Sequence, residues 1–193
     1  QQKGINIPPT LFIEPGDQRS LAGICTSSGW TDMILKPAVS GGARHTYRLQ
    51  TGGGTGQPTG DIGRRESIFR KLIQNESMML QEFQHRVINQ GELAFMLFGG
   101  KYSHAILKKA KAGDFRVQDD FGGSVHDHTS SDEEIAIAEK VVSVCDPLPV
   151  YARVDVIRDN NNELCVTELE LIEPELWFRN HPPAAELFAD AFL

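Results

Sequence analysis

The feature that most constrains the fold is an acidic segment, Tyr151 to Pro174, which has the pattern of two strands joined by a tight polar turn. Alternate side chains of an extended strand share a face, so Arg153 and Asp155 point the same way. After an Asp-Asn-Asn-Asn turn the chain returns, and Glu168 and Glu170 share one face of the second strand. Three carboxylates beside a single arginine repel one another unless something neutralises them. The segment therefore predicts a hairpin whose charges gather in one place.

This hairpin has two interpretations. Hard oxygen ligands grouped in this way suit Mg²⁺, which takes one or two protein carboxylates and completes its coordination with water and phosphate. Alternatively, acidic residues that alternate with apolar ones mark the solvated face of an antiparallel sheet. In that alternation Cys165, Thr167 and Leu169 are expected on the face opposite the two glutamates. The hairpin alone does not decide between a metal site and a wet sheet face.

Composition excludes some classes of protein. The chain has 193 residues and a net charge of −7, which argues against a nucleic-acid surface because such a surface needs a basic face. No apolar run approaches the ~20 residues needed to span a bilayer, so no membrane partner is expected. Three scattered cysteines without CxxC spacing indicate free thiols in a reducing compartment, and we expect a cytoplasmic protein. Because the chain opens at Gln1 without Met, we expect that an N-terminal part has been removed.

The remaining chain predicts many short antiparallel strands with a few helices, which is an α+β fold. Strands are expected at the end of 4–13 and at 31–37, 45–49, 78–83, 92–98 and 102–108, besides the hairpin. Helices are expected at 16–29 with Asp17 as N-cap, at 64–75, at 131–144 and at 183–192. Residues 51–61, TGGGTGQPTGD, cannot hold regular structure and are expected to be mobile.

Lys36 ends an apolar strand directly before a turn that contains Ser40, Gly41 and Gly42. A lysine on a rigid strand beside flexible backbone N–H donors is a sensible phosphate contact. The alternative is a lysine that merely ends a strand in solvent. The glycine runs could cover phosphates or form an irregular loop, and no GxxxxGK[ST] pattern of a P-loop is present.

Further polar residues follow where the first half of the chain gives way to the second. Glu82 and the backbone at Phe83 could face an adenine edge, and Glu92 could bind ribose hydroxyls, although most glutamates are simply solvated. Lys108 and Arg116 add two cations that could meet phosphate oxygens, Arg116 through a bidentate fork. The HxH pair in HDHTSSDE instead indicates a polar loop before a helix, because no further ligand completes a zinc set.

The order of these motifs resembles a known family. The sequence runs through ILKP with a glycine-containing turn, QEF, GE, FRVQ…GG, YARVD and V-TELELIEP. In this order it resembles the ATP-grasp superfamily, and most of all its glutathione synthetase-like branch, which includes the ATP-grasp ligase of cycloserine biosynthesis. The likeness covers nearly the whole chain and is most specific between Gln81 and Pro174. The resemblance implies two α+β lobes with antiparallel sheets that hold ATP between them.

Carried over residue by residue, the resemblance implies roles for the residues named above. ATP and its phosphates would be held by Lys36, Ser40, Gly41, Gly42, Glu82, Phe83, Glu92 and Lys108. Arg116 would approach the γ-phosphate, and Arg153 would lie beside the reacting carboxylate. Mg²⁺, with Mn²⁺ as the alternative ion, would be held by Asp155, Glu168 and Glu170. The family usually has Asn at the position of Glu170, which leaves the number of metal ions open, and its upstream nucleotide-binding Lys would precede Gln1.

We therefore expect two lobes, residues 1–80 with a glycine-rich lid and residues 81–193 with a metal-binding hairpin. The expected function is that of an ATP-dependent carboxylate–amine or carboxylate–thiol ligase core, which acts through an acyl phosphate on small-molecule substrates. The alternative is a regulatory module that binds ATP and magnesium without catalysis. The identity of the carboxylate and the nucleophile stays open, as does homo-oligomer formation.

Overall fold

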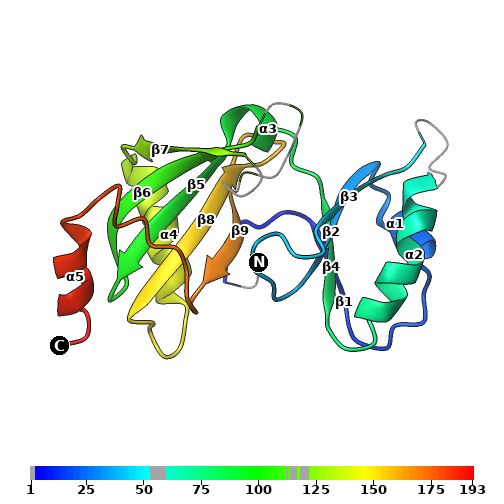
Figure 1. The fold of residues 1–193 in the computed structure, drawn as a ribbon, viewed down its shortest axis with the longest axis horizontal. Coiled ribbons are helices and arrows are strands. Elements are labelled where there is room, and N and C mark those ends of the chain that lie inside the picture. The colour runs from blue at the N-terminus through cyan, green and yellow to red at the C-terminus, as the bar shows by residue number, and fades with distance from the viewer. Residues whose placement is uncertain (1–2, 53–59, 112, 114–116, 118–121) are drawn as a thin grey trace. The chain divides into compact units, whose positions relative to one another are not determined.

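The structure is a computed structural model that describes residues 3–52, 60–111, 113, 117 and 122–193. The chain divides into two compact units (Figure 1). The smaller unit is Pro8–Phe83, and the larger unit combines Gln1–Ile7 with Gln84–Leu193. The chain therefore passes between the units twice, after Ile7 and after Phe83.

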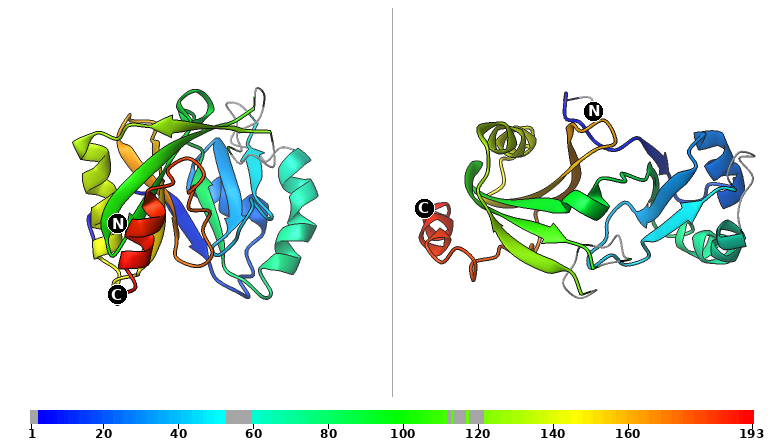
Figure 2. Two further views of the ribbon diagram at one scale, coloured as in Figure 1. Left: turned by 60° about the vertical axis from the view of Figure 1, so that its left-hand side comes forward. Right: turned by 90° about the horizontal axis from the view of Figure 1, so that it is seen from above.

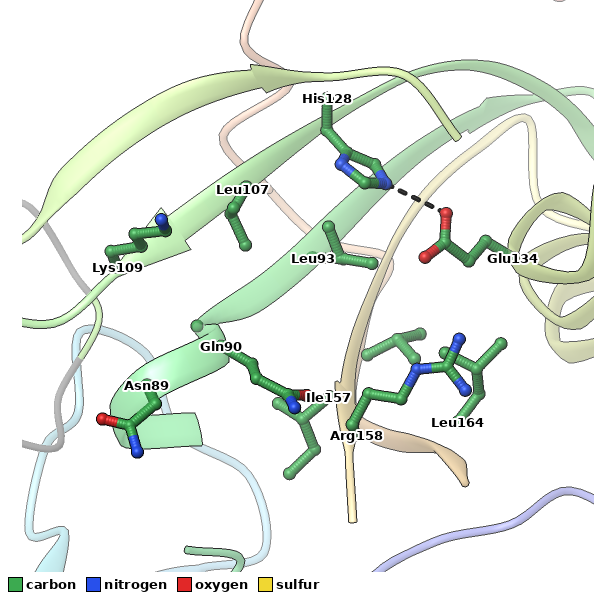
Figure 3. A pocket seen from close by; sticks show the side chains of 12 residues that line it. Asn89, Gln90, Leu93, Leu107, Lys109, His128, Glu134, Ile157, Arg158 and Leu164 are labelled. Carbon is green, nitrogen blue, oxygen red and sulfur yellow. Dashed lines mark hydrogen bonds and ion pairs between the residues drawn. The ribbon is translucent and has the colours of Figure 1, made fainter. Parts of the chain in front are cut away.

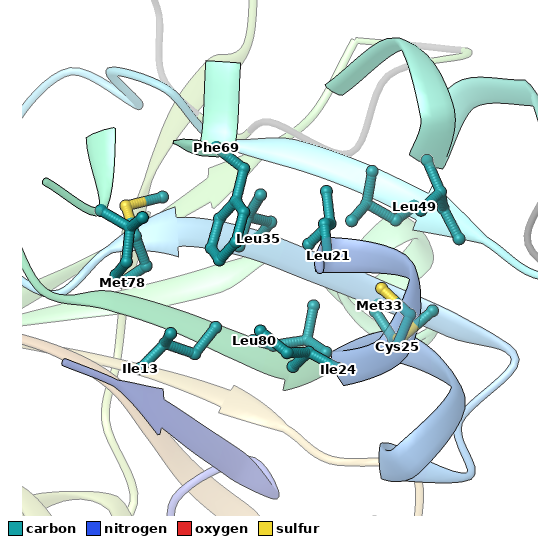
Figure 4. Packing of buried hydrophobic residues seen from close by; sticks show 12 residues of the cluster. Ile13, Leu21, Ile24, Cys25, Met33, Leu35, Leu49, Phe69, Met78 and Leu80 are labelled. Carbon is teal, nitrogen blue, oxygen red and sulfur yellow. The ribbon is translucent and has the colours of Figure 1, made fainter. Parts of the chain in front are cut away.

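The smaller unit is an antiparallel sheet with two helices on one face. Its elements are β1 (Thr10–Ile13), α1 (Leu21–Ser28), β2 (Asp32–Pro37), β3 (Tyr47–Gln50), α2 (Gly60–Leu72) and β4 (Met78–Glu82). The strand order is β1-β4-β2-β3. Apolar side chains from the sheet interlock with those of both helices to form a core, as Figure 4 shows for Leu35, Phe69 and Leu80. The opposite sheet face carries the polar alternate residues, among them Asp32, Lys36 and Arg48.

Helix α1 begins later than the sequence predicts. Ser20 is its N-cap, and the Ser20 hydroxyl accepts a hydrogen bond from the Gly23 amide (3.0 Å). The expectation of Asp17 as N-cap is wrong, because the Asp17 carboxylate receives the Arg19 guanidinium and the Arg19 amide instead. A short side chain satisfies the orphan donors of a first turn best from the position immediately before it, and Ser20 occupies that position.

The larger unit is a five-stranded antiparallel sheet in the order β7-β6-β5-β8-β9. Its elements are α3 (Val87–Gln90), β5 (Glu92–Phe98), β6 (Lys101–Lys109), β7 (Ser124–His128), α4 (Asp132–Ser143), β8 (Tyr151–Arg158), β9 (Leu164–Glu170) and α5 (Ala184–Asp190). Helices α4 and α5 lie on opposite sides of this sheet (Figure 2). The α4 side packs against Phe95, Leu97 and Val154, while the α5 side packs against Ala94 and Met96. The expected α+β class is confirmed.

Two elements of the larger unit differ from the sequence expectation. The segment expected as a polar loop before a helix contains β7, which pairs with β6 so that Ala105 lies opposite His128. Its residues are polar because β7 is the edge strand, a position that tolerates them. The short helix α3 is a further element that the sequence does not indicate. The start of α4 is as expected, with a capping box in which Ser131 and Glu134 satisfy each other's backbone amides. Among the described helices, none is long and apolar enough to cross a membrane.

Candidate active site

The three carboxylates of the acidic hairpin come together on the α5 side of the larger sheet. Strands β8 and β9 pair so that Asp155 lies opposite Glu168 and Arg153 lies opposite Glu170. Directly opposite residues of an antiparallel pair share a face at short range. Oxygen atoms of Asp155, Glu168 and Glu170 all lie within 4.8 Å of one another. Alternation puts Arg153 with Asp155 and Glu168 with Glu170, and a β-bulge between Asp155 and Val156 sets the register that brings the two pairs onto one face.

Two cations neutralise much of this charge. Lys108 Nζ lies 2.8 Å from Asp155 Oδ2 and 2.6 Å from Glu92 Oε1. Arg153 Nε donates to Asp155 Oδ1 (2.9 Å), and its Nη2 donates to Asp155 and to Glu170. Glu168 lies 4.0 Å from Arg153, and its side chain is 40% exposed. Lys108 and Arg153 thus clamp Asp155 from two sides.

The pKa values record how strongly these charges depend on one another. Burial alone would raise the pKa of Asp155, but Lys108 and Arg153 hold it below its ordinary value. Burial alone would lower the pKa of Lys108, but Asp155 and Glu92 raise it. Both pKa shifts favour the charged form, so the Asp155 carboxylate is ionised and the Lys108 ammonium is protonated at neutral pH. A buried charge of this kind persists only when it is paired.

Gly91 permits the close approach of Glu92 to Lys108. Its backbone has φ 79° and ψ −163°, a conformation essentially restricted to glycine. A Cβ at this position would lie 2.3 Å from the Lys108 carbonyl oxygen. The first residue of β5 can therefore sit against β6 only because the preceding residue has no side chain.

Thr167 is a site residue that strict alternation places on the wrong face. A β-bulge between Asp155 and Val156 leaves Thr167 as the extra residue of β9. Its hydroxyl donates to Glu92 Oε2 (2.9 Å) and lies 3.1 Å from the Asp155 carbonyl oxygen. Alternation along β9 would put Thr167 with Leu169, and no local signal in the sequence marks the bulge. Thr167 therefore joins the polar face, where it orients Glu92.

The smaller unit holds the residues expected to contact phosphates. Lys36 lies on β2 opposite Met79 of β4, on the face away from α1 and α2. Ser40 begins the turn that follows, and its hydroxyl donates to the Arg44 carbonyl (3.1 Å). The Arg44 amide bonds back to the Gly41 carbonyl, and Gly42 has a positive φ of 57°. The segment is a tight turn, and Gly42 takes a left-handed backbone conformation that glycine adopts without strain.

The residues expected to meet adenine are more constrained than the sequence indicates. Alternation along β4 puts the Glu82 side chain on the helix-covered face with Leu80, and the Glu82 amide donates to the Pro9 carbonyl (3.0 Å). The Phe83 amide donates to the Asp32 carbonyl (3.0 Å). Neither amide is thus the donor to a base. Phe83 is only 3% exposed, so contacts from these residues would have to come from carbonyl oxygens.

The candidates therefore fall into two groups. The larger unit brings six of them together, namely Glu92, Lys108, Arg153, Asp155, Glu168 and Glu170. The smaller unit contains Lys36, Ser40, Gly41, Gly42, Glu82 and Phe83. Arg116 lies outside the described residues, as do residues 53–59 of the expected glycine-rich lid.

A pocket of about 320 Å³ lies on the other side of the larger sheet (Figure 3). Apolar side chains such as Leu93 and Leu107 line it, and α4 contributes Glu134. Two of its polar side chains are engaged with protein partners: His128 bonds to Glu134 (2.9 Å), and Arg158 donates to the Asn162 carbonyl (3.1 Å). This pocket is separate from the acidic cluster, because alternate residues of one strand face opposite sides.

Comparison with known proteins identifies the family. Residues 62–173, more than half of the chain, match the RimK-like ATP-grasp domain. The chain belongs to this ATP-grasp family, as the order of its motifs predicts. The described face with Glu92, Lys108, Asp155 and the two hairpin glutamates falls within the matched region.

Two individual relatives match most of the chain, and one of them is a ligase by name. The chain is 28% identical over 158 residues to the tetrahydromethanopterin:α-L-glutamate ligase of Methanosarcina acetivorans, covering 80% of this chain and 46% of that protein. It is 27% identical over 206 residues to the cycloserine biosynthesis protein DcsG of Streptomyces lavendulae, covering 97% of this chain and 64% of that protein. The chain therefore spans about half to two thirds of the length of these relatives.

Solved structures agree on the fold. A crystal structure of D-cycloserine synthetase DcsG superposes with a TM-score of 0.79 at 24% identity, over 99% of this chain and 65% of that chain. A D-alanine–D-alanine ligase from Bacillus anthracis, complexed with ATP, superposes with a TM-score of 0.63 at 16% identity, over 98% of this chain and 60% of that chain. At these identities the likeness establishes the ATP-grasp fold.

Proposed function

We propose that the chain is the ATP-binding core of an ATP-dependent ligase that joins a carboxylate to an amine or thiol through an acyl phosphate. The observation that carries this proposal is the cluster of Lys108, Arg153 and Asp155, a buried ionic network beside two further carboxylates. Burying charges is costly, and a sheet that only needed stability would do as well with apolar residues. The named relatives, a glutamate ligase and a cycloserine biosynthesis protein, support the same class of reaction.

The donor set fits a divalent cation. Two cations, Lys108 and Arg153, face four carboxylates, so this cluster keeps a net charge of −2. Asp155, Glu168 and Glu170 offer the hard oxygen atoms that Mg²⁺ and Mn²⁺ prefer. Bound there, such an ion would supply neutralisation of the charge that develops on transferring phosphate oxygens. An ion that enters from solvent would meet Glu168 first, because its side chain is the most exposed of the three.

The chain's own residues would bind and orient the reactants. Lys36 and the turn at Ser40, Gly41 and Gly42 would contact phosphates, and Glu92 would accept hydrogen bonds from ribose hydroxyls while Thr167 orients it. Lys108 would contact the γ-phosphate from its place between Glu92 and Asp155.

Arg116 would approach the γ-phosphate, and Arg153 would orient the substrate carboxylate for attack on the γ-phosphorus, a planar pairing that suits a guanidinium. No described residue has to act as a covalent nucleophile, because positioning and electrostatics dominate this chemistry.

The proposal extends to the substrates and to the cellular compartment. Small-molecule carboxylates and amines are the proposed substrates, in line with the names of the relatives. All three cysteines are free thiols, which supports a reducing, cytoplasmic compartment. A non-catalytic ATP-binding module is less favoured, because it has no use for an arginine that clamps Asp155 beside two further acids.

The test is calorimetric titration of ATP into the protein with and without Mg²⁺, on the wild type and on Glu168→Gln. This substitution removes a ligand charge from the most exposed acid of the cluster, so it leaves the Lys108–Asp155 pair intact. We expect Mg²⁺-dependent ATP binding in the wild type and a loss of at least about tenfold in affinity in the variant.

The matched control is Glu163→Gln, an exposed glutamate in the turn between β8 and β9. Equal Mg²⁺-dependent affinity in wild type and Glu168→Gln would remove Glu168 from the metal site. Absence of ATP binding by the wild type under both conditions would overturn the proposed function itself.

A further inference from the structure

The face of the smaller sheet away from its helices carries an arrangement to which the family motifs give no role. Asp32 and Lys36 lie on β2, and Arg48 lies on β3 opposite Ile34. The other face is filled by the apolar core of Met33, Leu35 and the two helices. Arg48 and Asp32 are therefore charged residues on the same face as the proposed phosphate contact, Lys36.

Arg48 is held in a fixed orientation. Its Nε and Nη2 donate to the two oxygens of Asp32 at 2.9 and 2.6 Å, and Gln50 donates to the same carboxylate at 3.2 Å. A bidentate pair of this kind fixes the plane of the guanidinium as well as its position. Hydrogen bonding to Asp32 raises the pKa of Arg48 further above its ordinary value.

The fixed guanidinium covers the ring of Phe83. Arg48 Cζ lies 3.8 Å from the ring centroid, which is the distance of a stacked cation–π contact. Phe83 is also bonded to the backbone of Asp32, because its amide donates to the Asp32 carbonyl (3.0 Å). Asp32 thus holds Phe83 in two ways, directly through its carbonyl and indirectly through Arg48. Phe83 is the last residue of the smaller unit before the chain passes to the larger one.

We infer that Arg48 is a positioning residue of the nucleotide site, which with Asp32 fixes the backbone at Phe83 where its carbonyl meets the purine base. The inference rests on the proposed function and adds to it a residue pair that the family motifs do not contain. The amide of Phe83 is bonded to Asp32 and its ring is buried under Arg48, so Phe83 would serve the base through its carbonyl, which needs a fixed backbone. A purely structural ion pair would not require the aromatic stack.

The test separates recognition of the base from recognition of phosphate. ATP, ADP and inorganic tripolyphosphate are titrated, each with Mg²⁺, into the wild-type chain, Arg48→Met and Arg48→Lys. Arg48→Met removes the bidentate pair, and Arg48→Lys keeps a charge for Asp32 but loses the planar face. We expect ATP and ADP to bind about tenfold more weakly to Arg48→Met and less weakly to Arg48→Lys, with tripolyphosphate affinity unchanged in both.

The matched control is Arg65→Met. Arg65 also stacks on an aromatic ring of the smaller unit, with Cζ 4.4 Å from the Tyr47 centroid, but Tyr47 packs against the helix-covered core. Arg65→Met should bind all three ligands as the wild type does. The inference is overturned if Arg48→Met binds ATP normally, or if it loses ATP and tripolyphosphate to the same extent together with a fall in melting temperature. A wild type that binds tripolyphosphate but neither ATP nor ADP overturns it as well, and one that binds no ligand overturns the proposed function too.

Discussion

The polar faces of the two sheets differ in the sign of their net charge and in how deeply that charge is buried. The larger sheet buries four of its six candidate charged residues, with Asp155 only 1% exposed, and keeps an excess of carboxylates around Lys108 and Arg153. On the open face of the smaller sheet, Lys36 and Arg48 outnumber Asp32, so these three residues have a net charge of +1. The difference indicates a division of labour. An acidic, buried cluster suits a divalent cation, and a basic, more exposed face suits phosphate.

The largest effect on stability should come from the buried side of this comparison. Asp155→Ala leaves Lys108 and Arg153 close together without their shared counter-ion. Removing one member of a buried ionic network costs roughly 3–5 kcal/mol. Asp32→Ala, at the half-exposed Arg48, should cost only about 1–3 kcal/mol.

Urea unfolding, monitored by the hydrogen exchange of backbone amides in β8 and in β2, measures the two costs separately. Equal costs for the two aspartates would show that burial does not distinguish the sheets.

The second effect tests the backbone beneath the acidic cluster. Gly91→Ala puts a Cβ 2.3 Å from the Lys108 carbonyl in a conformation that L residues avoid, so β5 and β6 must separate there. We expect a loss of more than about 2 kcal/mol in the free energy of unfolding. Gly41→Ala in the smaller unit is the control, because nothing lies within 4 Å of the position that its new methyl group would take and its φ is not positive. A loss in Gly91→Ala no greater than in Gly41→Ala would contradict the close approach.

The third effect is a pH dependence. The pKa of Asp155 is lowered in the folded protein from 3.8, so the unfolded chain takes up the proton first as the pH falls. Its contribution to stability is therefore present above about pH 5 and is lost as the pH falls through and below 3.8. The raised pKa of Lys108 works in the other direction, since its contribution is complete below 10.5 and is lost only at higher pH.

Urea unfolding of wild type and Asp155→Asn between pH 3 and pH 8 measures the acid side. The stability of the variant should fall less steeply below about pH 5 than that of the wild type. Parallel curves would mean that Asp155 is not the residue that titrates.

How far the sequence predicts this structure depends on the range over which each feature is determined. Strand alternation predicts that Arg153 shares a face with Asp155 and that Glu168 shares one with Glu170, because that property needs only a period of two. The capping box at Ser131 is equally readable, since both partners lie within one turn. The order of the family motifs then predicts the ATP-grasp fold correctly.

The features that the sequence could not predict depend on contacts between distant segments. The bulge that turns Thr167 toward Glu92 arises from the pairing of β8 with β9, which alternation within β9 cannot reveal. The Arg48–Phe83 stack joins residues 35 positions apart in the chain, and each has an ordinary local context. Strand β7 was not predicted because its sequence is polar, and it forms a strand through its pairing with β6.

The bulge gives the fourth prediction. Thr167→Val keeps the shape of the side chain but removes the hydroxyl that donates to Glu92, so it should cost about 1 kcal/mol in unfolding free energy. Because Glu92 is also held by Lys108, its carboxylate should stay in place and tolerate the loss. Thr167→Ser restores the hydroxyl and should recover most of the stability. A Thr167→Val variant as stable as the wild type would show that the hydrogen bond to Glu92 contributes nothing to stability.

The smallest effect on stability is expected at Lys36, on the basic face, and it separates binding from folding most clearly. Lys36→Ala removes a half-buried side chain from the end of β2 without opening the apolar core, which lies on the other face of the sheet. The free energy of unfolding should change by no more than about 0.5 kcal/mol, while the affinity for tripolyphosphate should fall about tenfold. Thermal unfolding and calorimetric titration of the same sample give both values. A large fall in melting temperature with unchanged tripolyphosphate affinity would make Lys36 a structural residue, and the basic face of the smaller sheet would then lose its proposed contact with phosphate.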